Sequence, residues 1–226
     1  MPEYGGGINE REIRSQEKTK AWLDRLEEIE HIRDALGFPI DLTIREAIVG
    51  LNISGIPTSA SCEGHSDRGR GAPWIKVEAP NRPEERFVGE SNIVEMIAAK
   101  YHTSVENVRT GRDHEAWKEA THLAADNGET DEYRTWRKEN DVLQEKLSTF
   151  LEEFYQGRTA VPATHLELTH DAEGTWRVHN GGDDYKRNSR TLDDNERHLL
   201  AERLKRYQME MMAFTEFLKD KYYSSQ

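Results

Sequence analysis

The residues of this sequence best suited to chemistry lie close together, in the segment 55–74. The segment reads GIPTSASCEGHSDRGRGAPW, and Cys62, Glu63 and His65 bring a thiol, a carboxylate and an imidazole within four positions of one another. Thr58 to Cys62 are all small residues, which bury little apolar area and leave room for a ligand to approach. We therefore predict a ligand-binding or catalytic site here, with Cys62, Glu63 and His65 as its reactive or ligating groups.

Further side chains of this segment are candidates for ligand contacts. They combine a hydroxyl, a glycine, charged groups and an indole: Ser61, Gly64, Asp67, Arg68, Arg70 and Trp74. Planar guanidinium groups suit carboxylates and phosphates, so an anionic small molecule is the ligand that this loop favours. The alternative is that Arg68 and Arg70 form internal ion pairs with nearby acids such as Asp67.

Three interpretations of Cys62 and His65 stay open from the sequence. Cys62 could be a small buried core residue, as free cysteines often are, with His65 hydrogen-bonded in the loop. His65 could instead lower the pKa of the thiol, so that Cys62 acts as a nucleophile. The spacing Cys-x2-His also permits zinc, but two ligands are too few, and His165, His170 or His179 would have to complete the set. The sequence therefore assigns no metal ligand and leaves the cofactor unknown.

A predicted β-hairpin at residues 163–180 carries a second group of polar side chains. Alternation along it predicts one apolar, buried face made of Leu166, Leu168, Trp176 and Val178. The opposite face would carry His165, Glu167, Arg177 and His179. We count these four as ligand-binding candidates, provided that an inserted segment covers the face and closes a cleft with the Cys62 loop. Otherwise they form an ordinary solvated sheet face.

The composition limits the kinds of partner and location. The formal net charge is −12, and protonation of the nine histidines would not reverse its sign, which argues against general nucleic-acid binding. No stretch has the roughly 18–20 apolar residues of a membrane helix, and the N-terminus lacks the apolar region of a signal peptide. The single cysteine excludes an intrachain disulfide. We therefore expect a cytoplasmic protein with no membrane partner.

The rest of the chain predicts the elements that position the loop. Apolar residues recur at steps of three and four, as in amphipathic helices, over 22–36, 42–52, 130–155 and 200–222. Alternating patterns predict strands at 57–62 and 74–79 in addition to the hairpin, and the order of elements is not that of a parallel sheet. The expected fold is α+β: a mainly antiparallel four-stranded sheet with long amphipathic helices on one face.

Residues 91–127 are expected to form a small helical insertion. They contain short apolar patterns at helical spacing and a helix-start residue, Ser104. With no internal repeat, we expect one domain over residues 1–226 that includes this insertion. The two long helices also offer a surface through which copies of the chain could form a homo-oligomer.

The segment 41–74 resembles two groups of known proteins. Its SCEGH stretch is similar to the signature of uncharacterised bacterial proteins that carry a Ser-Cys-Glu-Gly-His motif. More distantly, it is similar to the Tyw3-type wybutosine-synthesis methyltransferases, through Thr58, Ser61, Cys62 and Gly64. Glu63 and His65 stand where that family has a serine and an arginine. The second resemblance implies S-adenosylmethionine as cofactor and a tRNA as substrate.

These observations give one leading function and two alternatives. The leading hypothesis is a binding or catalytic site for a small molecule or an anion at the Cys62 loop. The first alternative is S-adenosylmethionine-dependent methyl transfer to RNA or a small molecule. The second is a non-catalytic interaction protein that assembles through its long helices.

Overall fold

The computed structural model describes residues 10–34, 37–159, 161–171 and 174–225. The chain divides into two compact units. Unit 1 combines the chain up to Glu78 with the chain from Leu143 onward, and unit 2 is Ala79–Val142. Each unit is described by itself. Unit 2 contains the predicted insertion, residues 91–127, and is longer at both ends.

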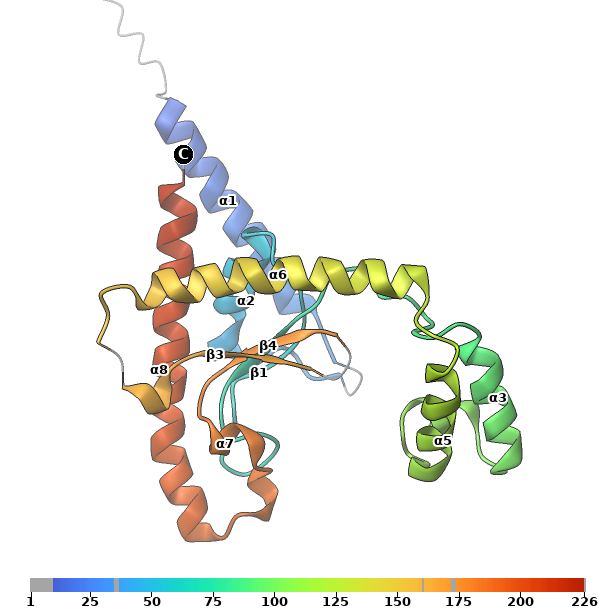
Figure 1. Cartoon of the computed structure of the whole chain (residues 1–226). Coiled ribbons are helices and arrows are strands. Elements are labelled where there is room, and N and C mark those ends of the chain that lie inside the picture. Colours follow the sequence, from blue (N-terminus) through green and yellow to red (C-terminus); the bar gives the residue numbers. More distant parts are fainter. Residues whose placement is uncertain (1–9, 35–36, 160, 172–173, 226) are drawn as a thin grey trace, which may run out of the picture. The chain divides into compact units, whose positions relative to one another are not determined.

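The sheet of unit 1 has four strands, all paired in antiparallel fashion. They are β1 (Thr58–Cys62), β2 (Trp74–Val77), β3 (Glu167–His170) and β4 (Trp176–His179), in the order β1-β2-β4-β3 (Figure 1). The predicted α+β class and the four-stranded antiparallel sheet are therefore confirmed. In this order β2 and β4 are the central strands, and β1 and β3 are the edge strands.

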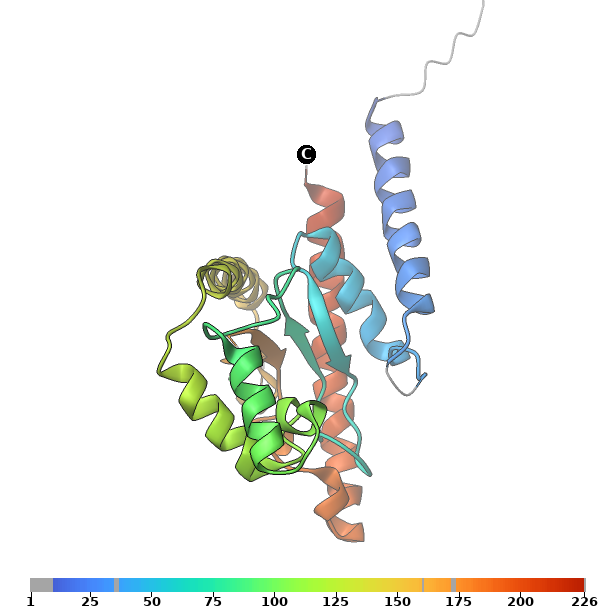
Figure 2. The same ribbon diagram turned by 90° about the vertical axis from the view of Figure 1, so that its right-hand side faces the viewer.

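Helices of unit 1 share one core with this sheet. They are α1 (Glu10–His31), α2 (Arg45–Ile53), the later part of α6 (Asp131–Tyr155), and α8 (Asp194–Ser224). α2 contacts β1, and α1 and α8 pack against α2. The polar start of α8 is a capping box, in which Asp193 and Glu196 each accept the other's backbone N–H. Figures 1 and 2 show α6 crossing α8 instead of running along it. The two long helices therefore contribute to the same core without running side by side.

Short elements link these helices and strands. A 3-10 turn, Leu42–Ile44, precedes α2, and another, Pro162–Thr164, precedes β3. After β4 come the one-turn helix α7 (Asp183–Lys186) and a 3-10 turn, Ser189–Thr191. Among the described helices, none combines the length and the apolar character needed to cross a membrane.

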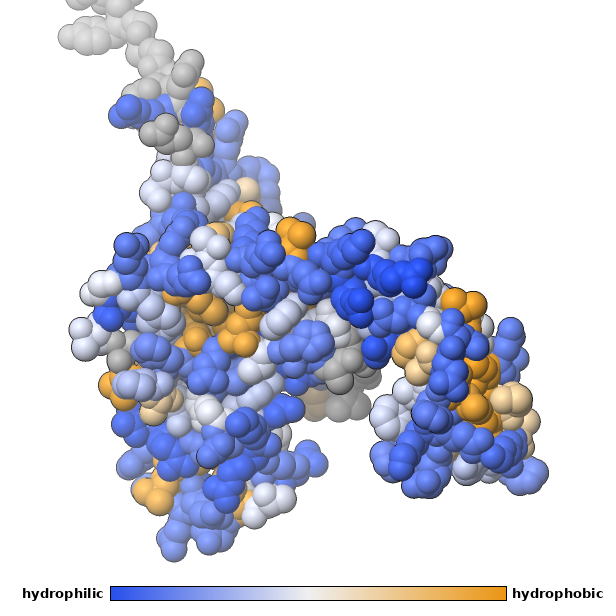
Figure 3. Space-filling model, in the orientation of Figure 1, coloured by the Kyte–Doolittle hydropathy of each residue, from blue (hydrophilic) through white to orange (hydrophobic). Residues whose placement is uncertain are grey.

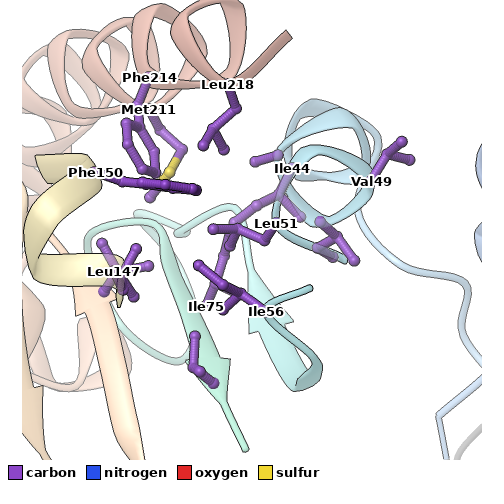
Figure 4. Packing of buried hydrophobic residues seen from close by; sticks show 14 of the residues in the cluster. Ile44, Val49, Leu51, Ile56, Ile75, Leu147, Phe150, Met211, Phe214 and Leu218 are labelled. Atoms are coloured by element: carbon purple, nitrogen blue, oxygen red, sulfur yellow. The ribbon is translucent and has the colours of Figure 1, made fainter. Parts of the chain in front are cut away.

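One hydrophobic core fills the space between the sheet and the helices. Figure 4 shows side chains from α2, β2, α6, α8 and the segments flanking α2 meeting there; the labelled ones are Ile44, Leu51, Ile56, Ile75, Leu147, Phe150, Met211, Phe214 and Leu218. Val49 belongs to the same cluster and lies on the other side of α2. At about 25 cal/mol per Å² of apolar surface, each fully buried aliphatic side chain contributes roughly 1.5–3 kcal/mol. The core therefore fixes the sheet in place, and with it the end of β1.

The strand register assigns every residue of the sheet to one of two faces. Ser61 pairs with Ile75, Ile75 with Val178, and Val178 with Leu168, and this row faces the core. Because neighbouring residues of a strand point to opposite sides, the next row lies on the other face. That row contains Cys62, Trp74, His179 and Glu167.

The expected apolar face of the hairpin is confirmed in its main members. Leu166 and Val178 are buried in the core, and Leu168 packs against it. Trp176 is on the same face but half-buried, because it pairs with the exposed end residue His170 and its ring lies against that imidazole. The polar face is confirmed for Glu167 and Arg177.

Unit 2 is built from α3 (Glu90–Lys100), α4 (Val105–Arg109), α5 (His114–Ala125) and the start of α6. Side-chain caps start two of these helices, since Ser104 accepts the N–H of Asn107 and Asp113 accepts that of Ala116. A small core joins the helices: Val94, Ile97, Ala98, Val108, Ala116 and Ala120. Hydrophilic groups dominate the surface seen in Figure 3, with apolar side chains visible on unit 2.

Candidate functional site

The loop after β1 turns sharply at Gly64, and only glycine fits there. Gly64 has φ +79, a left-handed conformation that other residues adopt at a cost. A Cβ at this position would lie 2.7 Å from both the carbonyl carbon of Ala72 and Cδ1 of Leu204. The glycine therefore lets the loop pass tightly against α8 and against the start of β2, and it turns His65 back towards Cys62.

The turn brings three potential metal ligands together. One ligand atom each from Asp41, Cys62 and His65 lies within 4.8 Å of the other two. The imidazole Nε2 of His65 is 3.8 Å from Oδ2 of Asp41, which is beyond hydrogen-bond reach. Ligands around a tetrahedral zinc ion lie about 3.3–3.8 Å apart, as bond lengths of about 2.0–2.3 Å require. The spacing therefore suits two ligands of one ion better than a hydrogen-bonded pair.

Asp41 enters the site from a different segment, immediately before the turn that leads into α2. Its Oδ2 accepts the backbone N–H of Glu63 at 3.0 Å. Glu63 in turn accepts the hydroxyl of Thr43 at 2.7 Å and the backbone N–H of the same residue at 3.4 Å. These reciprocal bonds hold the segment of Asp41 against the end of β1. Glu63 is therefore a positioning residue for Asp41 as well as the predicted reactive carboxylate.

The electrostatics of Cys62 favour a neutral thiol. Burial raises the pKa of the Cys62 thiol, and the charges of Asp41 and Glu63 raise it further. The N–H of Gly64, which lies 3.4 Å from Sγ, and the guanidinium of Arg68 act in the opposite direction. In the protein alone, Cys62 is thus poorly suited to be a thiolate nucleophile. A bound cation would reverse this, because a coordinated thiol loses its proton.

The cluster is partly open to solvent. The side chain of His65 is 15% exposed and that of Asp41 is 30% exposed, while Cys62 is half-buried. Backbone bonds fix the loop around them, since the N–H of His65 donates to the carbonyl of Arg70 and its carbonyl accepts the hydroxyl of Ser189. An ion and a small ligand can therefore reach a rigid site.

The charged residues of the loop have separate roles. Asp67 and Arg68 are exposed and 3.4 Å apart, in a weak surface pair that leaves Arg68 available to a ligand. Arg70 is not available in this way. It donates to the carbonyl of Tyr185 and lies over the ring of that residue, 4.4 Å from its centre. The prediction that Arg70 binds a ligand is corrected on this ground: its guanidinium holds α7.

Two neighbours of Cys62 in the sheet point to different sides. Trp74 is the cross-strand partner of Cys62 and lies on the same face, so it stays a candidate for ligand contact. Ser61 is next to Cys62 along β1, and its partner Ile75 is in the core. Its hydroxyl therefore belongs to the other face, and its prediction as a ligand contact is wrong.

Arg177 and His179 lie on the predicted face but have all their main interactions within the protein. Arg177 is 2.7 Å from Asp171 and stacks over Trp74 at 4.8 Å. His179 is buried under Tyr185, with ring centres 3.6 Å apart and planes 9° from parallel. Burial lowers the pKa of His179, so its imidazole is neutral at pH 7. Both side chains thus have contacts within the protein, while Nε of Arg177 is buried without a hydrogen-bond partner among the described residues. A ligand contact by either residue stays a prediction.

Glu167 and His165 are placed apart from the cluster. Glu167 is exposed on the edge strand β3, on the far side of His179 from Cys62. His165 precedes β3 and stacks on Tyr155 of α6 with ring centres 4.3 Å apart, on the helical side of the sheet. His165 therefore does not join the polar face, because strand alternation begins only after it. Of the three hairpin histidines, none joins the described cluster around Cys62.

Asp41 was not predicted from the sequence as a site residue. It lies 21 positions before Cys62, and no spacing rule links the two. The signal that could have found it is its place before a helix start, where a carboxylate is expected to accept backbone N–H groups. In the structure it accepts such a group from Glu63, outside its own helix.

Comparison of the chain with models of protein families, with curated proteins and with solved structures gives no match. The site is therefore interpreted from its own geometry.

Proposed function

We propose that this protein binds a divalent transition-metal ion of the zinc class through Asp41, Cys62 and His65, and that the ion holds a small anionic molecule. The observation that carries the proposal is the approach of three ligand atoms to within 4.8 Å of one another. Three protein ligands with partial solvent access are typical of zinc sites that keep a coordination position for water or substrate.

The charges around the cluster support a cation better than a nucleophile. Two carboxylates, of Asp41 and Glu63, surround a thiol whose pKa burial has already raised. A divalent ion would add positive charge beside these groups and stabilise the thiolate form of Cys62. It also satisfies the thiol, the imidazole and Asp41 together.

When bound, the ion would polarise a carbonyl or phosphoryl oxygen or lower the pKa of a water molecule. Arg68, exposed on the same loop, would contact the anionic group of the ligand. Glu63, adjacent to Cys62, would accept or donate a proton. We further propose a cytoplasmic location, where a lone thiol stays reduced.

Metal binding is tested with zinc and with cobalt as a spectroscopic probe. The chain should bind about one equivalent, with a sulfur-to-cobalt absorption band. Cys62→Ser should abolish the band, and Asp41→Asn and His65→Ala should each weaken zinc binding at least about 100-fold. His198→Ala is the matched control, because that imidazole is on α8 and its side chain is 79% exposed. Loss of less than threefold in all three ligand variants would contradict the proposal.

A thiolate–imidazole pair is the second candidate, favoured by the same proximity of His65 to Cys62 and Asp41. It predicts rapid alkylation of metal-free Cys62 at pH 7, slowed by His65→Ala. The metal proposal predicts alkylation slower than that of a cysteine in an unstructured peptide, no effect of His65→Ala, and full protection by zinc.

Two further alternatives have their own tests. Methyl transfer rests on the resemblance of residues 41–74 and requires saturable binding of S-adenosylmethionine. An interaction protein assembling through its long helices requires a homo-oligomer in solution. If the chain binds neither metal nor S-adenosylmethionine and its thiol is inert, the interaction protein is the function to retain.

A further inference from the structure

A cavity lies between α3, α4 and α5, and all of its lining residues belong to unit 2. It has a volume of about 190 Å³. Its floor is apolar and buried, formed by Val94, Val108 and Ala120. Its other lining residues are Glu84, Glu90, Ser91, Arg109, Trp117 and Thr121. This volume admits a short aliphatic chain with one polar group.

Trp117 forms a wall of this cavity. Its side chain is 40% exposed, although large aromatic residues are usually buried further. The ring is nevertheless held in place. The imidazole of His114 stacks on it, with ring centres 5.6 Å apart. An ordered, partly exposed indole offers its face to a cation.

The charges at the cavity leave an excess of negative charge. Arg109 donates to the hydroxyl of Ser91 and lies near Glu85, whose pKa it helps to lower after the larger effect of hydrogen bonds from Ser91. Glu90 accepts the backbone N–H groups of Arg86 and Phe87, in the segment before α3. Glu84 is exposed at the rim, and its carboxylate has no hydrogen-bond or ion-pair partner among the described residues. The lining thus contains two carboxylates, of Glu84 and Glu90, and one guanidinium, of Arg109.

We propose that this cavity binds an aliphatic ammonium or guanidinium group. The short alkyl stem would lie on Val94, Val108 and Ala120, and the charged head between the indole of Trp117 and the carboxylate of Glu84. This inference is independent of the metal site, because all of its residues lie in unit 2.

The test titrates the full chain with n-butylammonium, n-butylguanidinium, butanol and butyrate, and follows the backbone amide signals of the cavity lining, such as those of Ala120 and Thr121, by NMR. Both cations should bind saturably, in the millimolar range, whereas butanol and butyrate should bind at least about fivefold more weakly. Glu84→Gln and Trp117→Leu should each weaken cation binding about two- to fivefold. Capped lysine separates the two sources of this chemistry: tighter binding than n-butylammonium indicates a partner's side chain, and weaker binding indicates a free amine.

Glu106→Gln is the matched control, because Glu106 is an exposed carboxylate of α4 outside the cavity lining. It should leave binding unchanged. Glu84→Gln changes only an exposed side chain and should not affect folding, so it keeps the test valid if Trp117→Leu destabilises unit 2. Butyrate binding as tight as that of the cations, or cation binding that Glu84→Gln and Glu106→Gln affect equally, would overturn the proposal.

Discussion

Two regions on the outer side of the sheet carry an imidazole next to other reactive groups, and they differ in how far these groups bond to one another. The imidazole of His179 stacks on Tyr185, and its Nε2 is hydrogen-bonded to the hydroxyl of Thr169 at 3.1 Å. Around His65, Nε2 has Asp41 at 3.8 Å and the thiol of Cys62 nearby, with no hydrogen bond between the ligand atoms.

The difference shows that residue type alone does not mark a site. Both imidazoles belong to polar groupings that sequence analysis predicts to bind ligands. Buried polar groups with all their partners stabilise the fold, whereas converging ligand atoms without mutual bonds are available to a cation. Substitutions of four residues, Gly64, His65, His179 and Arg68, test whether the two regions differ in this way.

Gly64→Ala should have the largest effect, because it destroys the turn that creates the cluster. The added Cβ meets backbone atoms at 2.7 Å and 2.9 Å and also requires φ +79. We expect a loss of about 3–5 kcal/mol in the free energy of unfolding, measured by chemical denaturation. Gly69→Ala is the control, since Gly69 has φ +60 but open space around it, and it should cost about 1 kcal/mol.

The two imidazoles should respond in opposite ways to replacement by alanine. His179→Ala removes a buried stacked ring and should lower the free energy of unfolding by about 2–3 kcal/mol, with zinc affinity unchanged. His65→Ala should change the metal-free free energy of unfolding by less than about 1 kcal/mol and abolish tight zinc binding. Denaturation and zinc titration of both variants decide this, and equal losses of stability would remove the distinction.

Acid should destabilise the protein through His179. Burial lowers the pKa of His179 below its ordinary value of 6.5, so the unfolded chain binds more protons than the folded one. The stability from the neutral ring is therefore fully present above pH 6.5 and is lost as the pH falls towards the folded pKa, by at most about 1.4 kcal/mol per pH unit. His179→Phe keeps the stacking and should remove this part of the slope. An identical pH profile for both proteins would show that His179 does not titrate in this way.

Arg68→Ala should have the smallest effect on stability. Its pair with Asp67 is exposed, so the free energy of unfolding should change by less than about 0.5 kcal/mol. Binding of inorganic phosphate to the zinc-loaded protein should nevertheless weaken about three- to tenfold. Arg190→Ala provides a control on an exposed guanidinium of another segment. Unchanged phosphate binding in Arg68→Ala would remove this residue from the proposed site.

Local patterns were sufficient for most of the fold. Apolar residues at steps of three and four predicted α6 and α8, and alternating apolar residues predicted all four strands. Burial of one face of a helix or a strand imposes this spacing on the sequence. The loop at Cys62–His65 was also identifiable, since small residues, glycines and reactive groups seldom occur together in a segment that only packs.

The composition of the site could not be obtained in this way. Asp41 joins Cys62 because hydrogen bonds from Glu63 and Thr43 hold two distant segments together, and nothing in the spacing along the chain records those bonds. Arg70, Arg177 and His179 also have side chains that could bind a ligand. In the structure, Arg70 and His179 stack on Tyr185, and Arg177 contacts Asp171 and Trp74. The sequence determined which reactive groups exist and which element carries each. Only the tertiary structure decided which of them stack or pair with other side chains and which converge without bonds between their ligand atoms, because these contacts depend on distances between residues that are far apart along the chain.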